Sequence, residues 1–417
     1  MTGGPHMTGG PRMIGDTVSS LPQPGEDPFR LASLTPAELS QVTAAAAGRP
    51  VRDPGSRVTA LPYDWGSPAT AGLWRVEVHS GPGQDALAYT YFVKLLRHPR
   101  LWPGLRHFPD EASRQEFAAY LPWLFELDMA ESGISRVLPP GMRTPVLHHV
   151  KHTDADHVAL WWEYVSQRPG PWRLPDYQRA ARLLGRLAGR RRAGAAVNEL
   201  LPERCRSTPP GGALRGFVER RVMQSALPAL QAGQIWNHPV AAAALRRAAD
   251  PALPADLLAL GARIRPILDM LDRLPQTYAH GDASPQNLLL PVHEPDAVVV
   301  IDWGFGSLLP VGFDLGQLLV GLAHAGQARP SDLAGIDAAI FPAYLDGLRA
   351  ESYEAEPGQV RAGYIGSLAA RSALCSLPLE LLGGPPGEEA EELFRQRLQL
   401  TRTLVDMAAE ITVTAPA

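Results

Sequence analysis

The sequence predicts a two-lobed α+β fold, in which a small antiparallel β-sheet lobe precedes a larger, mainly helical lobe. The chain has 417 residues, more than one hydrophobic core usually supports. Residues 58–93 consist of short segments rich in Val, Leu, Trp and Tyr between Gly and Pro, a pattern typical of hairpins. Beyond residue 171 the chain changes to long Ala, Leu and Arg runs with helical spacing. We therefore expect a first lobe over residues 31–166 and a second over 167–417.

The first lobe is expected to begin with a helix that follows a disordered leader. Residues 1–30 are rich in Gly and Pro, so we expect no fold there. Thr35 is a suitable cap for a helix with Pro36 in its first turn, and Gly48 is a suitable end. The sequence therefore predicts a short helix over residues 35–47.

Alternation of apolar and polar residues predicts the strands of the first lobe. The alternating stretches are residues 73–78 and 88–94, and a further strand is expected over 158–165. Residues 111–129 carry apolar groups three and four apart, which predicts one helix packed on this sheet, kinked at Pro122. In the second lobe, helical periodicity covers residues 175–194, 254–274, 332–349, 360–377 and 388–409.

Composition and charge exclude several classes of protein. The hydrophobic fraction of 45% and the charged fraction of 20% are those of an ordinary globular chain. A net charge of −4 provides no general basic field, so we expect neither nucleic acid nor an anionic membrane as the main partner. The two cysteines, Cys205 and Cys375, are far apart and predict no disulfide framework. With no apolar signal segment at the start, the cytoplasm is the expected location.

The densest chemical signal lies in residues 278–290 and 298–304. Asp282 follows a predicted strand, Asn287 comes five residues later, and Asp302 ends a second apolar strand. Phosphoryl transfer needs a carboxylate beside the attacking hydroxyl and oxygen ligands that hold magnesium on the phosphates. Asp282 is a candidate for the first role, and Asn287 and Asp302 are candidates for the second because both should reach the same cleft.

This pattern resembles the aminoglycoside and choline phosphotransferase family, relatives of the protein kinases, whose loop reads HGDxxxxN and whose metal turn reads I-D-F/W. The resemblance implies a bilobal protein-kinase-like fold and an ATP- and Mg²⁺-dependent kinase acting on a hydroxyl group. By this resemblance Asp282 is the catalytic base, and Asn287 and Asp302 are the magnesium ligands. His280 then organises the loop, and Asp314, the second aspartate after the metal turn, braces it.

The resemblance also implies residues for ATP binding in the first lobe. Lys94 ends a predicted strand, where a kinase places the lysine that contacts the α- and β-phosphates. Glu116 on the following helix is its expected partner, with Glu111 as a nearby competitor. The loop around Ser67 would cover the phosphates, although it departs from GxGxxG, and a plain hairpin connection is the alternative interpretation.

Residues 161–165 resemble the strand-to-hinge segment of the family, which is expected to contact the adenine. By the resemblance, the backbone of Glu163 and Val165 would contact the adenine edge. A buried edge strand is the alternative interpretation, and it is compatible with this role because the contacts are main-chain.

Other interpretations compete with a kinase of small molecules. One is a kinase of peptide or protein Ser/Thr, which is weakened because only residues 303–312 separate the metal turn from Asp314. Another is a nucleotide-binding pseudokinase, against which the intact carboxylates argue. A zinc site at His148, His149, His152 and His157 matches no closed spacing, so we expect a solvated hairpin there. The divergent helices of the second lobe should determine the acceptor, which is expected to be a hydroxylated small molecule.

Overall fold

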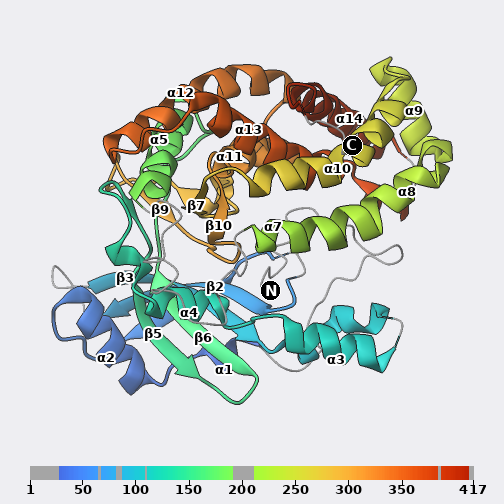
Figure 1. The fold of residues 1–417 in the computed structure, drawn as a ribbon. Coiled ribbons are helices and arrows are strands. Elements are labelled where there is room, and N and C mark those ends of the chain that lie inside the picture. Colours follow the sequence, from blue (N-terminus) through green and yellow to red (C-terminus); the bar gives the residue numbers. More distant parts are fainter. Residues whose placement is uncertain are drawn as a thin grey trace.

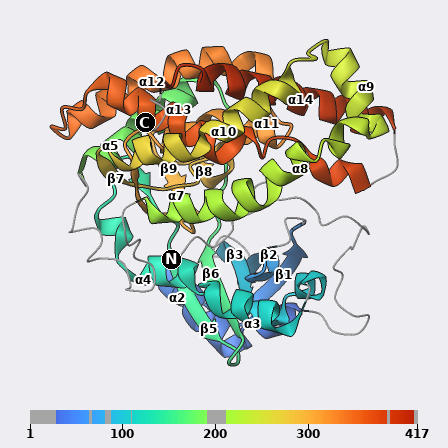
Figure 2. The same cartoon turned by 45° about the vertical axis from the view of Figure 1, so that its right-hand side comes forward.

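A sheet-containing part and a mainly helical part lie next to each other in the computed structural model (Figures 1 and 2). The structure describes residues 28–63, 67–80, 87–108, 110–190, 211–383 and 387–412. The predicted α+β fold, with a small antiparallel sheet and a mainly helical remainder, is confirmed. Among the helices in these ranges, none combines the length and apolar character that crossing a membrane requires.

The sheet has five strands in the order β1-β2-β3-β6-β5, and all neighbours are antiparallel. Its strands are β1 (Gly55–Ala60), β2 (Thr70–Ser80), β3 (Leu87–Arg97), β5 (Leu147–His152) and β6 (His157–Glu163). Inward residues alternate along the central strands, for example Val76 and Val78 on β2 and Tyr91 and Val93 on β3, all at most 1% exposed. Burial of this face fixes the register of β3, in which Lys94 is paired with Leu160 of β6.

Two short helices, α1 (Phe29–Ala32) and α2 (Pro36–Ala47), cover this apolar face. The ring of Phe29 lies edge-on to Trp74 with centroids 5.4 Å apart, so Phe29, which the sequence assigns to the leader, packs against the sheet. Residues 1–27 of the predicted leader lie outside the described residues. The helix predicted at 35–47 is confirmed, because Thr35 and Glu38 form a capping box and Gly48 ends the helix with φ of 67°.

The helix expected over residues 111–129 is two helices in the structure. The first, α3 (Glu111–Tyr120), ends at Leu121, which has extended backbone, and α4 (Phe125–Glu131) follows after a short break. Pro122 explains the break, because a proline disfavours helical backbone at the residue before it and lacks the N–H donor. The expectation of one kinked helix is therefore wrong, and the break changes which acidic residue reaches the sheet.

The helical part is built around a long bundle with two small β-structures at its inner side (Figure 2). Its longer helical elements are α5 (Leu174–Arg190), α7 (Gly212–Phe217), the π-helical η6 (Val218–Ala226), α8 (Leu227–Gln231), α9 (Pro239–Ala248), α10 (Leu253–Asp272), α11 (Asp314–His324), α12 (Leu333–Ala350), α13 (Pro357–Leu368), the π-helical η10 (Ala369–Ala373) and α14 (Glu388–Ala408). The short 3₁₀ segments are η2 (Pro99–Leu101), η3 (Pro103–His107), η4 (Ile134–Arg136), η7 (Gln234–Asn237), η8 (Pro285–Asn287), η9 (Pro330–Asp332) and η11 (Leu379–Gly383).

The small β-structures carry the motif residues. One pairs β7 (Gln276–Ala279) with β10 (Ser307–Pro310), antiparallel. The other has the order β4-β9-β8, with β4 (Met142–Arg143), β9 (Val298–Val300) and β8 (Leu288–Leu289). Because β7 runs into the loop that holds Asp282 and β9 runs toward Asp302, the two structures bring both motif segments together.

Candidate active site

The loop after β7 is held by one buried carboxylate, that of Asp314 at the start of α11. Its Oδ2 accepts the backbone N–H of His280 at 2.9 Å, and its Oδ1 accepts that of Gly281 at 2.8 Å. Asp314 is 2% exposed, and this burial raises the pKa of its carboxyl group. Both oxygens are thus used by the loop backbone, as a bracing role requires.

Glycine is required at position 281 by two features of the backbone. Its φ is +80°, in the left-handed region that side chains with a Cβ rarely adopt. A Cβ added there would lie 2.2 Å from the carbonyl oxygen of Phe305, which belongs to the segment leading into β10. The loop therefore passes directly against the turn that follows Asp302.

His280 joins this loop to the end of β9. Its Nε2 lies 2.9 Å from the carbonyl oxygen of Ile301, and its Nδ1 accepts the backbone N–H of Asp282 at 3.2 Å. These partners assign the proton to Nε2, because a carbonyl oxygen only accepts and a backbone N–H only donates. With both ring nitrogens bonded to backbone, His280 has the contacts of a loop-organising residue.

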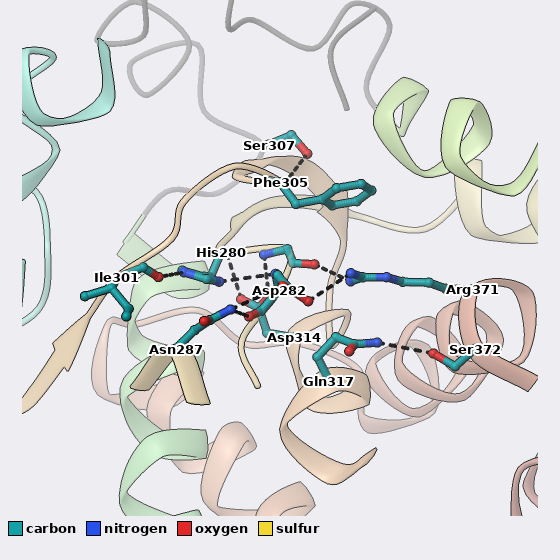
Figure 3. A network of polar contacts seen from close by, with 11 residues as sticks. His280, Asp282, Asn287, Ile301, Phe305, Ser307, Asp314, Gln317, Arg371 and Ser372 are labelled. Carbon is teal, nitrogen blue, oxygen red and sulfur yellow. Dashed lines mark hydrogen bonds and ion pairs between the residues drawn. The ribbon is translucent and has the colours of Figure 1, made fainter. Parts of the chain in front are cut away.

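Asp282 is 1% exposed, and side chains contact both of its carboxylate oxygens (Figure 3). Nη2 of Arg371 lies 2.9 Å from Oδ1, and Nδ2 of Asn287 lies 3.2 Å from Oδ2. The same Asn287 nitrogen donates to the backbone carbonyl of Asp282 at 2.9 Å, which folds the loop back on itself. The five-residue spacing of the motif thus closes a compact turn.

Asn287 and Asp302 are brought together by the register of two strands. Leu288 pairs with Val300, and the N–H of Ile301 donates to the carbonyl of Asn287 at 3.0 Å, so Asp302 is the next residue beyond this bond. Asp302 has φ of +63°, which is uncommon for a residue other than glycine and turns the chain sharply after the strand.

These two residues fit a magnesium ion by their chemistry. Asn287 contacts Asp282 through its amide nitrogen, and its amide oxygen takes no part in these two hydrogen bonds. Asp302 supplies a carboxylate. In the part of the chain that the structure describes, no group of three His, Cys, Asp or Glu side chains is arranged for a metal. One carboxylate and one amide oxygen completed by phosphate oxygens is the arrangement typical of magnesium with a nucleotide.

Lys94 pairs with Glu126 of α4, which corrects the expected pairing with Glu116. The Nζ atom of Lys94 donates to Oε2 of Glu126, with side-chain exposures of 12% and 25%. Glu116 is exposed on α3, ahead of the break at Pro122, and the structure does not bring it to Lys94. Burial alone would lower the pKa of Lys94, but the charges of Glu126 and Asp302 outweigh it and raise that pKa.

A pocket is lined both by Lys94 and by the turn that begins at Asp302. Its walls include Ser67, Lys94, Glu126, Asp302 and Gly304, together with apolar residues of the segment before α4. Ser67 is 7% exposed, and its Oγ accepts the hydroxyl of Thr70 at 3.4 Å. Ser67 therefore lies on the wall where a phosphate-covering loop is expected, while Gly66 lies outside the described residues.

The expected hinge segment follows β6 and is anchored through Glu163. Its backbone N–H donates to the carbonyl of Val146 at 2.8 Å, so an adenine contact at Glu163 would use its carbonyl oxygen. Both carboxylate oxygens of Glu163 accept from Arg143 at 2.8 Å. Burial works to raise the pKa of Glu163, but Arg143 lowers it overall. Val165, two residues on, is partly buried.

The sequence did not predict Arg371, Glu126 or Arg143. Arg371 lies far beyond the motif, on η10, and nothing near it in the sequence indicates a role beside Asp282. Glu126 could have been found by treating Pro122 as a helix end, because Glu126 then becomes an acid in the first turn of a new helix. Arg143 belongs to a two-residue strand too short for a periodic signal.

The fold and the site define a phosphotransferase. The model of the phosphotransferase enzyme family (APH) matches residues 80–353, and this chain belongs to that family. The predicted family and its phosphotransferase activity are thereby confirmed. No curated protein sequence matches the chain.

Several solved structures are similar to this chain. An aminoglycoside phosphotransferase from Alicyclobacillus acidocaldarius is 12% identical with a TM-score of 0.46, over 80% of this chain and 92% of that one. An aminoglycoside phosphotransferase from Streptomyces rimosus, solved with ADP and streptomycin, is 15% identical with a TM-score of 0.38, over 70% and 92%. An ethanolamine kinase from Plasmodium vivax is 14% identical with a TM-score of 0.40, over 83% and 81%.

Proposed function

We propose that this phosphotransferase transfers the γ-phosphoryl group of ATP to a hydroxyl of a small molecule, with Mg²⁺ as cofactor and Asp282 as the base. The observation that carries the proposal is the convergence of Asp282, Asn287 and Asp302 beside the pocket that holds Lys94. In this mechanism Asp282 orients the acceptor hydroxyl and takes its proton as the oxygen attacks the γ-phosphorus, while the bond from that phosphorus to the bridging oxygen breaks and ADP leaves. Asn287 and Asp302 would hold Mg²⁺, which would supply positive charge that neutralises the phosphates.

The first lobe would bind the rest of the nucleotide. The ammonium group of Lys94 would contact the α- and β-phosphates, and Glu126 would keep it aimed into the pocket. The loop at Ser67 would cover the phosphates, and the backbone of Glu163 and Val165 would contact the adenine. These roles rest on the family resemblance, and the contacts of Lys94 and the position of Ser67 on the pocket wall support them.

A small acceptor is favoured over a peptide by the segment between Asp302 and Asp314. Residues 307–310 of this segment form β10, which pairs with β7 through Ser307 and Ala279. The segment is therefore folded back on the catalytic loop and offers no extended platform for a substrate peptide. Ser/Thr peptides are therefore the acceptor class that we expect to cause no ADP release.

The proposal is tested by following ADP release from Mg-ATP with hydroxylated antibiotics, sugars, amino alcohols and Ser/Thr peptides as acceptors. Asp282→Asn should lower kcat by roughly 10²- to 10⁴-fold, the contribution of a positioned base. Asp302→Ala should abolish the effect of Mg²⁺ on nucleotide binding, measured by titration calorimetry. Because Asp282→Asn leaves Arg371 without its carboxylate, retained binding of an ATP analogue serves as the control for folding.

Two outcomes would contradict the proposal. One is a purified protein that binds no Mg-ATP. The other is an Asp282→Asn variant whose turnover stays within about threefold of the wild type, since a base that contributes so little is not the base.

A further inference from the structure

Arg371 connects the catalytic loop to the C-terminal helices. It lies on η10, the π-helical extension of α13, and its side chain is only 5% exposed. The guanidinium donates from Nη2 to Oδ1 of Asp282 at 2.9 Å and from Nη1 to the carbonyl of Gly281 (Figure 3). It thus holds both the side chain of the proposed base and the backbone before it.

The guanidinium is itself fixed by three aromatic rings. Its central carbon lies 4.8 Å from the ring centre of Phe305, 5.4 Å from that of Phe217 and 5.7 Å from that of Phe313. These rings come from three different segments, the turn after Asp302, the end of α7 and the residue before α11. Rings at these distances attract a cation and restrict the plane of the guanidinium.

We propose that Arg371 is a positioning residue for phosphoryl transfer, which fixes Oδ1 of Asp282 so that Oδ2 faces the acceptor hydroxyl. This inference rests on the proposed function of Asp282. The contact on Oδ2, from Asn287 at 3.2 Å, is longer than the 2.9 Å contact on Oδ1. Oδ2 is therefore the oxygen whose protein contact is more easily replaced by a substrate hydroxyl.

The position of the carboxylate matters because transfer depends on alignment. A displacement of about 1 Å in a reacting group lowers the rate by roughly 10²-fold. The carboxylate of Asp282 can rotate about the side-chain bonds, and within the described residues both of its oxygens accept from side chains and not from backbone N–H groups. Its orientation is therefore set by Arg371 on one side and Asn287 on the other.

The experiment compares Arg371→Met and Arg371→Lys with two controls on α13. Arg361→Met and Arg361→Lys alter an arginine that also pairs with carboxylates, of Asp337 and Glu410, and lies over two aromatic rings, but outside the site. The probes are Mg-ATP with water as acceptor, followed as release of radiolabelled phosphate, and an ATP analogue for calorimetry. Crystal structures of the two Arg371 variants give a readout that needs no acceptor.

Arg371→Met should lower kcat by roughly 10²-fold while the Kd of the ATP analogue changes less than about twofold. Arg371→Lys should recover part of kcat, because an ammonium keeps the charge but reaches fewer acceptors. The crystal structures should show the Asp282 carboxylate displaced by more than about 0.5 Å, the tolerance of a productive site. Neither Arg361 variant should change kcat.

Three results would overturn the inference. The first is an undisplaced Asp282 in the variant crystals, and the second is an Arg371→Met variant with unchanged turnover. The third is an equal loss of analogue binding and turnover in both Arg371 variants, which would make Arg371 a structural residue only. If Asp282→Asn abolishes transfer while the Arg371 variants do not, the proposed function stands and this inference alone fails.

Discussion

The substitution Glu126→Gln tests whether Lys94 pairs with Glu126, as it does in the structure, or with Glu116, as the sequence predicts. Lys94 and Glu126 have side-chain exposures of 12% and 25%, so their pair lies between the exposed and the fully buried case. Exposed pairs contribute about 0.2–1 kcal/mol, whereas breaking a buried pair costs about 3–5 kcal/mol. We therefore expect Glu126→Gln to remove about 1–3 kcal/mol of the interaction that holds Lys94 in place, and a loss of this size at the phosphates corresponds to a roughly 5- to 150-fold lower kcat/KM for ATP.

Glu116→Gln is the matched control, since this acid is exposed on α3 and should change kcat/KM by less than about twofold. The assay is ADP release at varied ATP, with each variant also made in a Lys94→Met background. The double-mutant cycle should give a coupling energy above about 0.5 kcal/mol for Lys94 with Glu126 and near zero for Lys94 with Glu116. A larger coupling energy for Lys94 with Glu116 than with Glu126 would refute the pairing in the structure and support the prediction from sequence.

Two further predictions concern stability, measured by urea unfolding. Gly281→Ala should lower the free energy of unfolding by at least about 2 kcal/mol more than Gly326→Ala does. Both glycines have positive φ, but only at position 281 would a Cβ clash, at 2.2 Å from a backbone oxygen. Equal losses in the two variants would contradict this prediction. Burial, with the charges of Arg397 and Arg371, lowers the pKa of His324 to about 3, so below the ordinary value near 6.5 the unfolded chain binds the extra proton. Stability should fall by up to about 1.4 kcal/mol per pH unit from pH 6.5 downward, and His324→Asn should remove about 2 kcal/mol of the loss between pH 7.5 and pH 5.0. An unchanged pH dependence in this variant would show that His324 is not the group that titrates.

The motif residues could be predicted because their geometry is local. Asp282 and Asn287 are five residues apart in one loop, and the antiparallel pairing of β8 with β9 carries Asp302 to the same place. The residues of a short loop and of paired strands have few alternative arrangements, so spacing along the chain largely determines spacing in the structure. Lys94 was expected to end its strand, whereas β3 continues beyond it to Arg97.

The partners of these residues could not be predicted, because they are selected by packing between distant segments. Glu116 and Glu126 fall on one predicted helix, and only the break at Pro122 decides which of them faces β3. Arg371 reaches Asp282 because α13 continues into a π-helical turn, where the sequence predicts only an uninterrupted helix. A helical pattern gives the apolar face of a segment and not the neighbour that this face meets.

Two buried aspartates lie in one small site, and their partners distinguish their roles. Asp314 accepts only backbone N–H groups in the contacts described for it, and moving it would release two donors of the catalytic loop. Asp282 is held by side chains, which can turn when a cation or a substrate arrives, while its position is kept by the guanidinium of Arg371. A carboxylate that must exchange a partner during turnover is better served by side-chain contacts than by backbone ones. This contrast supports the proposal that Asp282 is the base and that Asp314 holds the loop.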